Sequence, residues 1–356
     1  MSACFAVAEW FPHLANQPSP VASPRKTLTR FDDYREMLSD AVRMEAYREA
    51  IAAVVRPGDV VVDLGAGLGI LSFLAVRAGA EKVYAIEQGG QIELARALAA
   101  KNGLASRIEF IEDNSKRVTL PAPANVLLSE TLGSFGVDEN TLDFTLDARE
   151  RLLEPGGRMI PEALELFLAP VELPEDHSRV AFWNDVEGFD FSPAIDELMS
   201  RMSLSRVAPG ALLSEAQSFY EIDLRTHREV TLERKLLFQM QRPGVLHGLA
   251  GWFEVALSAD VSFATSPSSP STHWQQAFFP FRQPVSVTPG DFLEVVFAVG
   301  PKAEHSDDTR VSYDYRCTQR ANEGKAAQPP VPSPVARNAP CPCGSGKKFK
   351  RCCGRA

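Results

Sequence analysis

A glycine-rich turn near the start of the chain has the residue types and spacing that hold a nucleotide-like cofactor. It runs Asp63-Leu64-Gly65-Ala66-Gly67-Leu68-Gly69 and follows an apolar run. Glycine lets the backbone pass close to a ligand and direct its N–H groups at the ligand's polar end. The spacing G-x-G-x-G differs from the G-x-G-x-x-G of nicotinamide-binding folds and favours S-adenosylmethionine. We predict cofactor contacts from Asp63, Gly65, Gly67 and Gly69; the alternative is a tight turn without a ligand.

Two further segments complete the predicted cofactor site. Glu87 ends the next apolar run, Lys82–Ile86, where a carboxylate can accept both ribose hydroxyls of an adenosine. Asn114 and Ser115 follow a third apolar run and carry groups that can hydrogen-bond the edge of adenine. A solvated strand end at Glu87 and a plain polar loop at residues 113–115 are the alternatives.

Four of the six cysteines lie close together near the C-terminus, at Cys341, Cys343, Cys352 and Cys353. This clustering differs from the even scatter of a disulfide framework and favours metal binding in a reducing compartment. Four thiolates can close a tetrahedral zinc site and then leave no open position for catalysis. We predict a structural zinc site, with redox-active or incidental cysteines as the alternative.

The elements that must position the cofactor residues alternate between helix and strand. Apolar residues recur at helical spacing through residues 31–55. The apolar runs at 60–64 and 82–86 flank the glycine turn and a helical stretch, which together make a βαβ unit. The elements predicted next are a helix at 92–102, strands at 108–111 and 124–129, and a helix at 142–153 with a turn at 154–157. We predict a doubly wound, Rossmann-like α/β domain at residues 31–160.

The pattern of apolar residues changes after Pro161. Alternating apolar runs are separated by Pro, Gly and Ser, which is typical of antiparallel strands. These runs are 164–168, 229–241, 251–257 and 292–299. We predict a β-barrel-like substrate domain at residues 161–317 with a helical arm near residues 180–202. The arm carries Phe182, Trp183, Phe189 and Phe191.

The two ends of the chain differ from these domains. Residues 1–30 contain several prolines and little periodicity, so we expect a loosely ordered arm. Residues 318–338 are rich in proline and alanine and predict a semi-extended linker. The predicted zinc module occupies residues 339–356.

Composition is that of an ordinary soluble protein. The 356 residues are 45% hydrophobic and 23% charged, and the net charge is −9. This balance argues against general nucleic-acid binding, although no acid follows Glu323 and the tail is cationic. No stretch approaches the roughly 20 apolar residues that span a bilayer, and residues 1–14 lack the basic start of a secretory signal. We expect a cytoplasmic protein without a membrane partner.

Four separated motifs resemble those of the protein arginine N-methyltransferases in order and spacing. They are Tyr34–Arg43, Asp63–Gly69, Ser129–Gly133 with Glu139, and Ser271–Trp274. The resemblance covers residues 32–317 and includes residues 182–190, which resemble part of the family's dimerisation arm. It implies use of S-adenosylmethionine, arginine in a protein as the methyl acceptor, and a homodimer.

The family places two glutamates at the ends of one hairpin loop, and Glu130 and Glu139 reproduce that interval. A guanidinium is a planar, delocalised cation at ordinary pH and is therefore a poor nucleophile. Two carboxylates that hold its N–H edges orient it and leave one nitrogen more nucleophilic towards the sulfonium methyl. The resemblance thus implies that Glu130 and Glu139 are catalytic.

The same resemblance implies roles for residues outside the hairpin. His273, oriented by Asp40, takes the proton that the acceptor nitrogen loses, or a carboxylate takes it. Arg43 pairs with the carboxylate of the cofactor's methionine part, and Met37 lies beside the reacting methyl. Residue type alone offers an alternative for each. Arg43 would be a surface charge, Met37 a core residue and His273 a loop residue packed on an aromatic ring.

Residues 341–354 resemble the SEC-C motif, a zinc-binding tail best known from the bacterial preprotein translocase ATPase. The motif implies a bacterial source and a docking role for the tail. Its cationic residues suit an acidic protein face or RNA phosphates, and the sequence does not separate these partners. These residues are Lys347, Lys348, Lys350 and Arg351.

Three hypotheses for function follow. The leading one is an enzyme that methylates arginine in a protein. The second keeps the cofactor and the glutamates but acts on a small guanidino or amino metabolite. The third is a non-catalytic, cofactor-binding scaffold. The glutamate pair favours an enzyme, because a scaffold has no need of two like charges facing one pocket.

Overall fold

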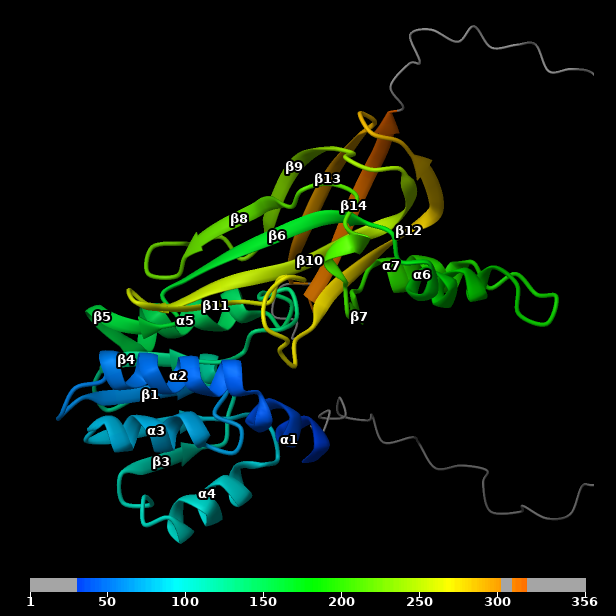
Figure 1. Cartoon of the computed structure of the whole chain (residues 1–356). Coiled ribbons are helices and arrows are strands. Elements are labelled where there is room, and N and C mark those ends of the chain that lie inside the picture. Colours follow the sequence, from blue (N-terminus) through cyan, green and yellow to red (C-terminus); the bar gives the residue numbers. More distant parts are fainter. Residues whose placement is uncertain (1–30, 302–308, 319–356) are drawn as a thin grey trace, which may run out of the picture. The chain divides into compact units, whose positions relative to one another are not determined.

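Two helices begin the part of the chain that this computed structural model describes, residues 31–301 and 309–318 (Figure 1). Helix α1 spans Phe31–Ser39 and α2 spans Ala41–Val54, so the predicted helical region is confirmed as two helices. Asp40 separates them, and its side chain accepts a hydrogen bond from the Arg43 N–H as the N-cap of α2. The predictions for residues 1–30, for most of the linker and for the zinc module with Cys341, Cys343, Cys352 and Cys353 lie outside the described residues.

Five parallel strands form the sheet that carries the glycine turn. They are β1 (Val60–Leu64), β2 (Lys82–Ile86), β3 (Ile108–Ile111), β4 (Ala124–Ser129) and β5 (Leu153–Ile160). Their order is β3-β2-β1-β4-β5, and every neighbouring pair is parallel. The connecting helices are α3 (Ile70–Ala78), α4 (Ile92–Lys101), η1 (Ser115–Arg117) and α5 (Thr141–Leu152). The predicted doubly wound α/β class is confirmed.

The direction of winding changes between β1 and β4. The chain passes from β1 outwards to β2 and β3, and then returns to place β4 on the other side of β1. In open α/β sheets, ligands bind beyond the carboxyl ends of the strands at such a switch point. The glycine turn follows β1 and Glu130 follows β4, so the topology brings these two motifs to one crevice.

The turn predicted at residues 154–157 lies inside β5, the strand that directly follows α5. Leu153 pairs with Ala124 and Arg158 pairs with Val126, so the intervening residues bulge out of the ladder. Gly156 has φ +77° and permits the bulge. The chain does bend at these residues, as the glycines predict, but because the residues on both sides pair with β4, the bend is a bulge within one strand.

Antiparallel strands make up the second half, as predicted. They are β6 (Ala163–Val171), β7 (Ser203–Ser205), β8 (Gln217–Asp223), β9 (Leu232–Gln239), β10 (Gly244–Ser258), β11 (Val261–Ala264), β12 (Gln276–Val287), β13 (Phe292–Pro301) and β14 (Thr309–Thr318). One sheet has the order β7-β12-β10-β6-β8, with β11 on β10, and the other has the order β14-β13-β9. The long strand β10 pairs with three others and is buried over most of its length.

An aromatic cluster joins the two halves beneath the crevice. Phe135 belongs to the loop after β4, yet its ring is fully buried among rings of the antiparallel half. The ring lies edge-on to those of Phe279 and Phe297, with ring centroids 5.3 Å and 5.7 Å apart. A single core of buried side chains therefore runs through both halves and fixes the loop against the barrel-like sheets.

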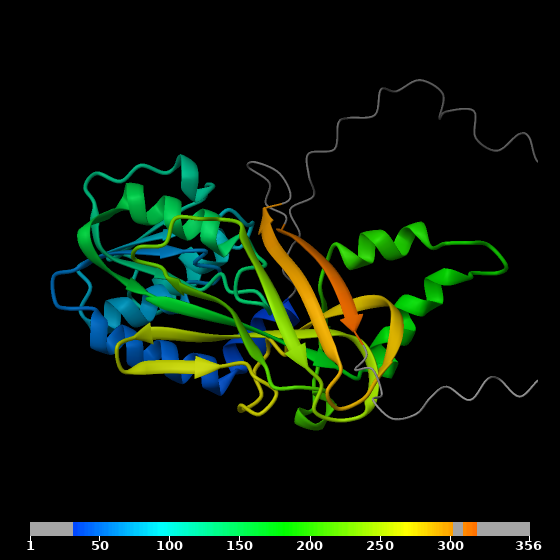
Figure 2. The same ribbon diagram turned by 90° about the horizontal axis from the view of Figure 1, so that it is seen from above.

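A helical arm leaves the antiparallel half and projects away from the parallel sheet (Figures 1 and 2). It consists of α6 (Pro174–Ala181), the short helix η2 (Phe182–Asn184) and α7 (Pro193–Met199). The helix predicted across residues 180–202 is interrupted, because Glu187 and Gly188 have positive φ and form a tight turn between Val186 and Phe189. Among the described residues, no helix is long and apolar enough to cross a membrane.

Candidate active site

A cavity of about 770 Å³ opens at the switch point of the parallel sheet. Its wall contains the glycine turn after β1, Glu87 after β2 and Glu130 after β4. The antiparallel half contributes His273 and Trp274, and helix α1 contributes Met37. The cavity therefore brings together side chains from both halves of the molecule.

The glycine turn is shaped so that only glycine fits. Gly65, Gly67 and Gly69 have φ of +73°, +52° and +85°. A Cβ at Gly65 would lie 2.6 Å from Thr131 Cγ2, and one at Gly67 would lie 3.2 Å from the Tyr34 ring. The turn leads into α3, whose first N–H groups and positive dipole end face the same region. This cradle fits the polar end of a cofactor.

Glu87 lies at the carboxyl end of β2, on the cavity wall. Its carboxylate accepts hydrogen bonds from the N–H of Gly67 at 2.9 Å and of Gly89 at 2.5 Å. An ionised carboxylate has roughly four lone-pair positions, so about two remain for ribose hydroxyls. Glu87 is thus tied to the glycine turn as well as placed at the predicted ribose position.

Some of the predicted cofactor residues line the cavity, and others contact only neighbouring protein residues. Gly65, Gly67 and Ser115 are in the wall, whereas Asp63, Gly69 and Asn114 are not. Asp63 is 1% exposed and accepts a hydrogen bond of 2.5 Å from Ser72 Oγ. Burial raises the pKa of Asp63 to about 6, although the hydrogen bonds from Ser72 oppose the shift. Its observed contact is with helix α3.

Asn114 likewise makes structural contacts. Its side-chain oxygen accepts the Lys116 N–H at 3.0 Å and so caps η1, and its amide nitrogen donates to Gln88 at 3.1 Å. The neighbouring Asp113 and Ser115 reach the cavity wall. An adenine contact from this loop therefore fits Ser115 better than Asn114.

Arg43 is buried and paired with the first glutamate. Its Nε donates to Glu130 Oε2 at 2.8 Å, Nη2 donates to the same oxygen, and both side chains are 7% exposed. Nη1 donates to the Met37 carbonyl at 3.4 Å. Burial lowers the pKa of Arg43, but the charge and hydrogen bond of Glu130, together with the charges of Tyr47 and Asp40, outweigh burial and raise it. The surface-charge alternative for Arg43 is excluded, and Glu130 already holds a guanidinium.

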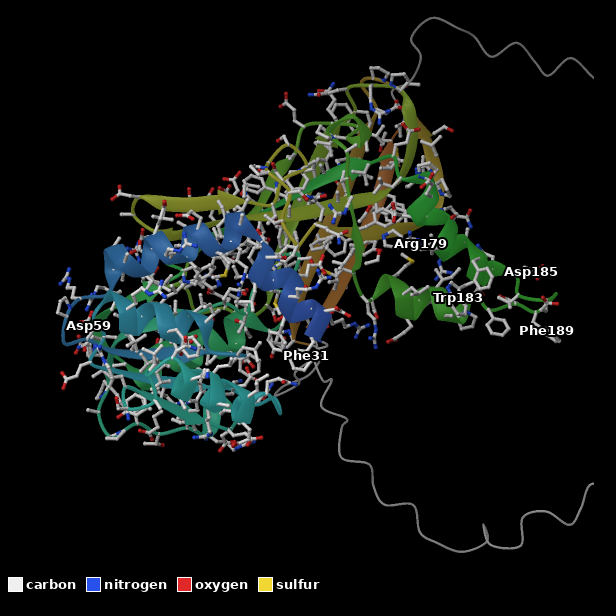
Figure 3. All side chains as sticks on the ribbon, turned by 60° about the horizontal axis from the view of Figure 1, so that its bottom comes forward. Phe31, Asp59, Arg179, Trp183, Asp185 and Phe189 are labelled. Carbon is white, nitrogen blue, oxygen red and sulfur yellow. The ribbon has the colours of Figure 1, made fainter. Side chains whose placement is uncertain are left out.

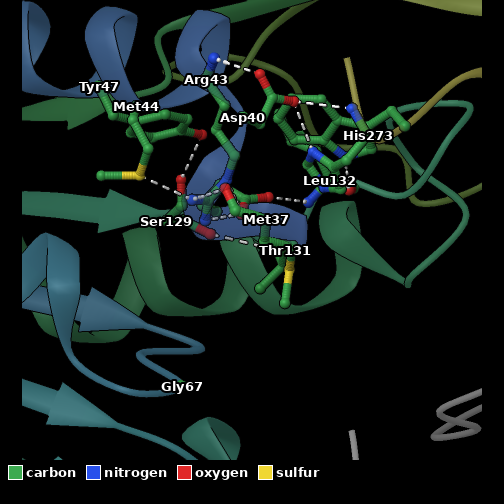
Figure 4. A network of polar contacts seen from close by, with 12 residues as sticks. Met37, Asp40, Arg43, Met44, Tyr47, Gly67, Ser129, Thr131, Leu132 and His273 are labelled. Carbon is green, nitrogen blue, oxygen red and sulfur yellow. Dashed lines mark hydrogen bonds and ion pairs between the residues drawn. The ribbon is translucent and has the colours of Figure 1, made fainter. Parts of the chain in front are cut away.

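Asp40 and His273 form the predicted pair (Figure 4). Asp40 Oδ2 lies 2.9 Å from His273 Nδ1 and accepts the His273 backbone N–H at 2.8 Å. An ionised carboxylate is only an acceptor, so Nδ1 carries the proton and Nε2 of the neutral ring is the acceptor. Burial raises the pKa of Asp40, but the hydrogen bonds from His273 and Arg43 outweigh this and lower it. The His273 ring also packs on Trp274, with centroids 4.1 Å apart.

Glu139 lines the cavity at the other end of the hairpin from Glu130. Glu139 is exposed to solvent at the cavity mouth, although protein atoms crowd around its carboxyl group. This burial raises the pKa of Glu139 to about 7, and the charges of Asp138 and Glu130 add to the shift. Near neutral pH, Glu139 is thus poised between its protonated and ionised forms.

Contacts with the antiparallel half and with α5 hold the hairpin in place. Trp274 Nε1 donates to the Leu132 carbonyl at 2.6 Å, and Thr141 Oγ1 donates to the Thr131 carbonyl at 2.5 Å. Asn140, with φ +56°, donates its N–H to Thr309 Oγ1 at 3.1 Å. The backbone strain at the residue after Glu139 is thus supported by β14.

Sequence patterns missed several residues of the cavity wall. Asp138 lies directly before Glu139, and its acidic side chain was the available signal. Tyr34 lies one helical turn before Met37, so helical spacing could have found it. Met202 and Leu204 also line the cavity, but they come from the segment around β7 and carry no local signal. Within residues 31–301 and 309–318, no group of His, Cys, Asp and Glu is arranged to hold a metal ion.

Three family descriptions match parts of the chain. Residues 162–320 match the arginine methyltransferase oligomerization subdomain, and residues 27–146 match the TRM5/TYW2 methyltransferase domain. Residues 337–355 match the SEC-C motif. The match to the oligomerization subdomain covers the antiparallel half, and the match to the methyltransferase domain covers most of the parallel half. The SEC-C match covers the cysteine cluster.

Similar proteins and structures point in the same direction. Protein arginine N-methyltransferase 1 of Schizosaccharomyces pombe is 31% identical over 304 residues, which is 80% of this chain and 89% of that protein. Protein arginine N-methyltransferase 6 of Xenopus laevis is 32% identical over 269 residues, or 71% and 79% of the two chains. The structure of the Trypanosoma brucei PRMT1 enzyme-prozyme heterotetrameric complex with AdoHcy has a TM-score of 0.73 at 25% identity and covers 82% of this chain and 95% of that one.

Proposed function

The chain belongs to the protein arginine N-methyltransferase family, and we propose that it transfers a methyl group from S-adenosylmethionine to a guanidino nitrogen of arginine in a protein substrate. The observation that carries this proposal is that Glu130 and Glu139 line the same cavity as the glycine turn. A cofactor site and a site for a cationic acceptor are therefore adjacent.

The cofactor-binding role falls to residues that fit it. The glycine cradle and the free lone pairs of Glu87 suit the adenosine part, with Ser115 near the base. Bound S-adenosylmethionine supplies an electrophilic methyl group on a sulfonium. Arg43 is placed to attract the methionine carboxylate while it holds Glu130, and Met37 lines the same wall.

The acceptor role falls to the two glutamates. Arg43 holds Glu130 rigidly through Oε2. The other oxygen, Oε1, accepts a long hydrogen bond of 3.4 Å from the Leu132 N–H and keeps acceptor capacity for one edge of the substrate guanidinium. Glu139 receives the other edge in its ionised form. Together they orient the guanidinium and draw its positive charge towards the held nitrogens, which leaves the remaining nitrogen more nucleophilic.

The proton lost by the acceptor nitrogen needs a base near the cavity. His273 offers Nε2 because Asp40 fixes Nδ1 as the donor, and Glu139 offers a carboxylate whose pKa is close to neutral. Both groups line the cavity, and both are retained as candidates for this step.

The arm supports a proposal of homodimerisation. Phe182, Phe189 and Phe191 are 57%, 70% and 41% exposed on it, which leaves large apolar side chains in water. Figure 3 shows Phe189 at the outer end of the arm, with Trp183 nearby. The arm also lies within the segment that matches the oligomerization subdomain. Replacing Phe182 and Phe189 by Ser is expected to convert a dimer to a monomer in analytical ultracentrifugation, and a monomeric wild type would contradict this.

The C-terminal match supports a zinc-binding tail that docks the enzyme. We retain as proposals the zinc ligands Cys341, Cys343, Cys352 and Cys353, a cationic docking surface for an acidic protein or RNA, a bacterial source and a cytoplasmic location. Truncation after Thr318 is expected to leave methylation of an arginine peptide unchanged and to weaken methylation of native proteins. Equal activity of both forms on native proteins would remove the docking role.

The decisive test is methyl transfer from tritiated S-adenosylmethionine into a cell lysate. Wild type and Glu130→Gln are compared, with protein separated from small molecules before amino-acid analysis. Label in protein as methylarginine, lost in the variant, is the expected result. Label in small molecules alone would point to a metabolite acceptor, and cofactor binding without transfer would point to a scaffold.

A further inference from the structure

The hairpin contains a third carboxylate, Asp138, that the proposed mechanism does not use. It lies between the turn of the hairpin and Glu139, and it lines the same cavity. Its Oδ1 accepts the Phe135 N–H at 2.7 Å, and the backbone N–H groups of Ser134 and of Asp138 itself also stabilise its charge. Burial nevertheless raises the pKa of Asp138 to about 6. Burial disfavours the charged form of this carboxylate, so we asked what its position in the loop contributes to the site.

The turn is built around the Asp138 carboxylate. Gly133 lies against it, and a Cβ at Gly133 would overlap the carboxylate in this position, so a larger residue there would displace the Asp138 side chain. The backbone of Phe135 is held by Asp138, while the Phe135 ring is buried in the aromatic cluster of the antiparallel half. Asp138 therefore connects the segment that carries Glu139 to the rigid core.

Asp138 also contributes to the electrostatic environment of Glu139. After burial, the charge of Asp138 makes the largest contribution to the raised pKa of Glu139, ahead of the charge of Glu130. Other ionisable side chains on the cavity wall come from several elements: Asp33 and Glu36 of α1, Arg43 of α2, Glu87, Asp113 and His273. The two basic groups in this set are engaged elsewhere, Arg43 with Glu130 and His273 with Asp40. Among the described residues of the cavity wall, no remaining cation therefore offsets the charge of Asp138 at Glu139.

We propose that Asp138 is a positioning residue for methyl transfer: its carboxylate holds the hairpin closed so that Glu139 faces the acceptor guanidinium. The charge of Asp138 also disfavours a second negative charge on the adjacent Glu139. This inference rests on the proposed function. It makes the capture of a guanidinium dependent on pH, because a protonated Glu139 cannot pair with a cation. Binding of the positively charged acceptor then favours the ionised form.

The test compares Asp138→Asn and Asp138→Ala with wild type, using Asp260→Asn as a control for the loss of one surface charge. Asn keeps an oxygen for the Phe135 N–H and removes the charge. We expect the acidic limb of the pH profile of kcat/KM for an arginine peptide to move about 0.5 to 1 unit lower in Asp138→Asn. Asp138→Ala is expected to lose on the order of 10- to 100-fold in kcat/KM with unchanged affinity for S-adenosylmethionine, because the hairpin loosens. The Asp260→Asn profile is expected to match wild type.

An acidic limb that is the same in Asp138→Asn and wild type would overturn the electrostatic part. Equal activity of Asp138→Ala and wild type would overturn the positioning part. A readout without substrate separates these results from failure of the proposed function. The titration of the Glu139 carboxyl is followed by ¹³C NMR in protein labelled at glutamate Cδ and assigned with Glu139→Gln. Its midpoint is expected at lower pH in Asp138→Asn even if wild type methylates no arginine peptide.

Discussion

The two ends of the hairpin carry the same residue type in opposite electrostatic environments. Glu130 shares a buried ion pair with Arg43, and both side chains are 7% exposed. Glu139 has two carboxylates as neighbours, and its pKa is raised to about 7. The first glutamate is thus fixed by a buried cation, while the ionised form of the second is disfavoured until a cation binds beside it. In the proposed mechanism the first is a rigid anchor and the second a clamp that responds to the charge of the acceptor.

Glu130→Gln is expected to have the largest effect, because it removes the anchor. Removing a preorganised charged contact to the reacting group costs on the order of 100- to 1000-fold in kcat. Arg43 also loses its ionic partner in a buried site, which is expected to lower the free energy of unfolding by roughly 2 to 3 kcal/mol. Steady-state kinetics and urea unfolding measure the two effects. Unchanged unfolding would show that the Arg43 pair contributes little to stability.

Glu139→Gln is expected to reduce kcat/KM about 100-fold but to stabilise the protein at alkaline pH. The folded pKa of about 7 lies above the ordinary value of 4.5, so the folded protein keeps a proton that the unfolded chain has lost. The contribution of Glu139 to stability therefore falls as pH rises from 4.5 to about 7. Urea midpoints at pH 8 are expected to be higher for the variant, with no difference near pH 4. A lower midpoint at pH 8 would contradict the comparison between the two glutamates.

Arg43→Lys is expected to reduce kcat/KM by roughly 30-fold, because it keeps the charge but loses the planar fork. Arg43 Nε and Nη2 both donate to one oxygen of Glu130, and Nη1 reaches the Met37 carbonyl. A lysine ammonium cannot make these contacts together. The matched control is Arg48→Lys, an exposed residue of the same helix. A wild-type rate in Arg43→Lys would show that charge alone holds Glu130.

Asp40→Asn is expected to have the smallest effect, a loss of about tenfold in kcat. Asn still caps α2, but its amide has one acceptor oxygen for the two sets of contacts that Asp40 makes with Arg43 and His273. If His273 is the base, the pH dependence of kcat changes as well. If the pH profile keeps its shape, Glu139 becomes the favoured base.

Local patterns predicted the parallel half of the fold closely. Strands β1, β3 and β4 have the predicted ends, because buried parallel strands are continuous apolar runs that stand out from their flanks. The glycine turn was found because positive φ values and close neighbouring atoms favour glycine at its three positions, which leaves a local signal in the sequence. The arm and the turn predicted at residues 154–157 were less well predicted, because strand pairing and turns there depend on neighbours distant in sequence.

Long-range contacts could not be obtained from residue patterns. The Arg43–Glu130 pair joins residues 87 positions apart, and the Asp40–His273 pair joins residues 233 positions apart. The family resemblance named all four residues and anticipated the second pair, but it assigned Arg43 to the cofactor. Asp138 was missed, because its part in the site depends on how the hairpin closes around it.

The sequence by itself determined which strands form, where the backbone must turn and which charged side chains are available for the chemistry. These features depend on backbone sterics and on hydrophobic periodicity, which act over a few residues. Only the tertiary structure decided which carboxylate is neutralised and which has a raised pKa. The physical reason is that desolvation and ion pairing depend on side chains brought together from distant elements, when the aromatic core closes the hairpin against the antiparallel sheets.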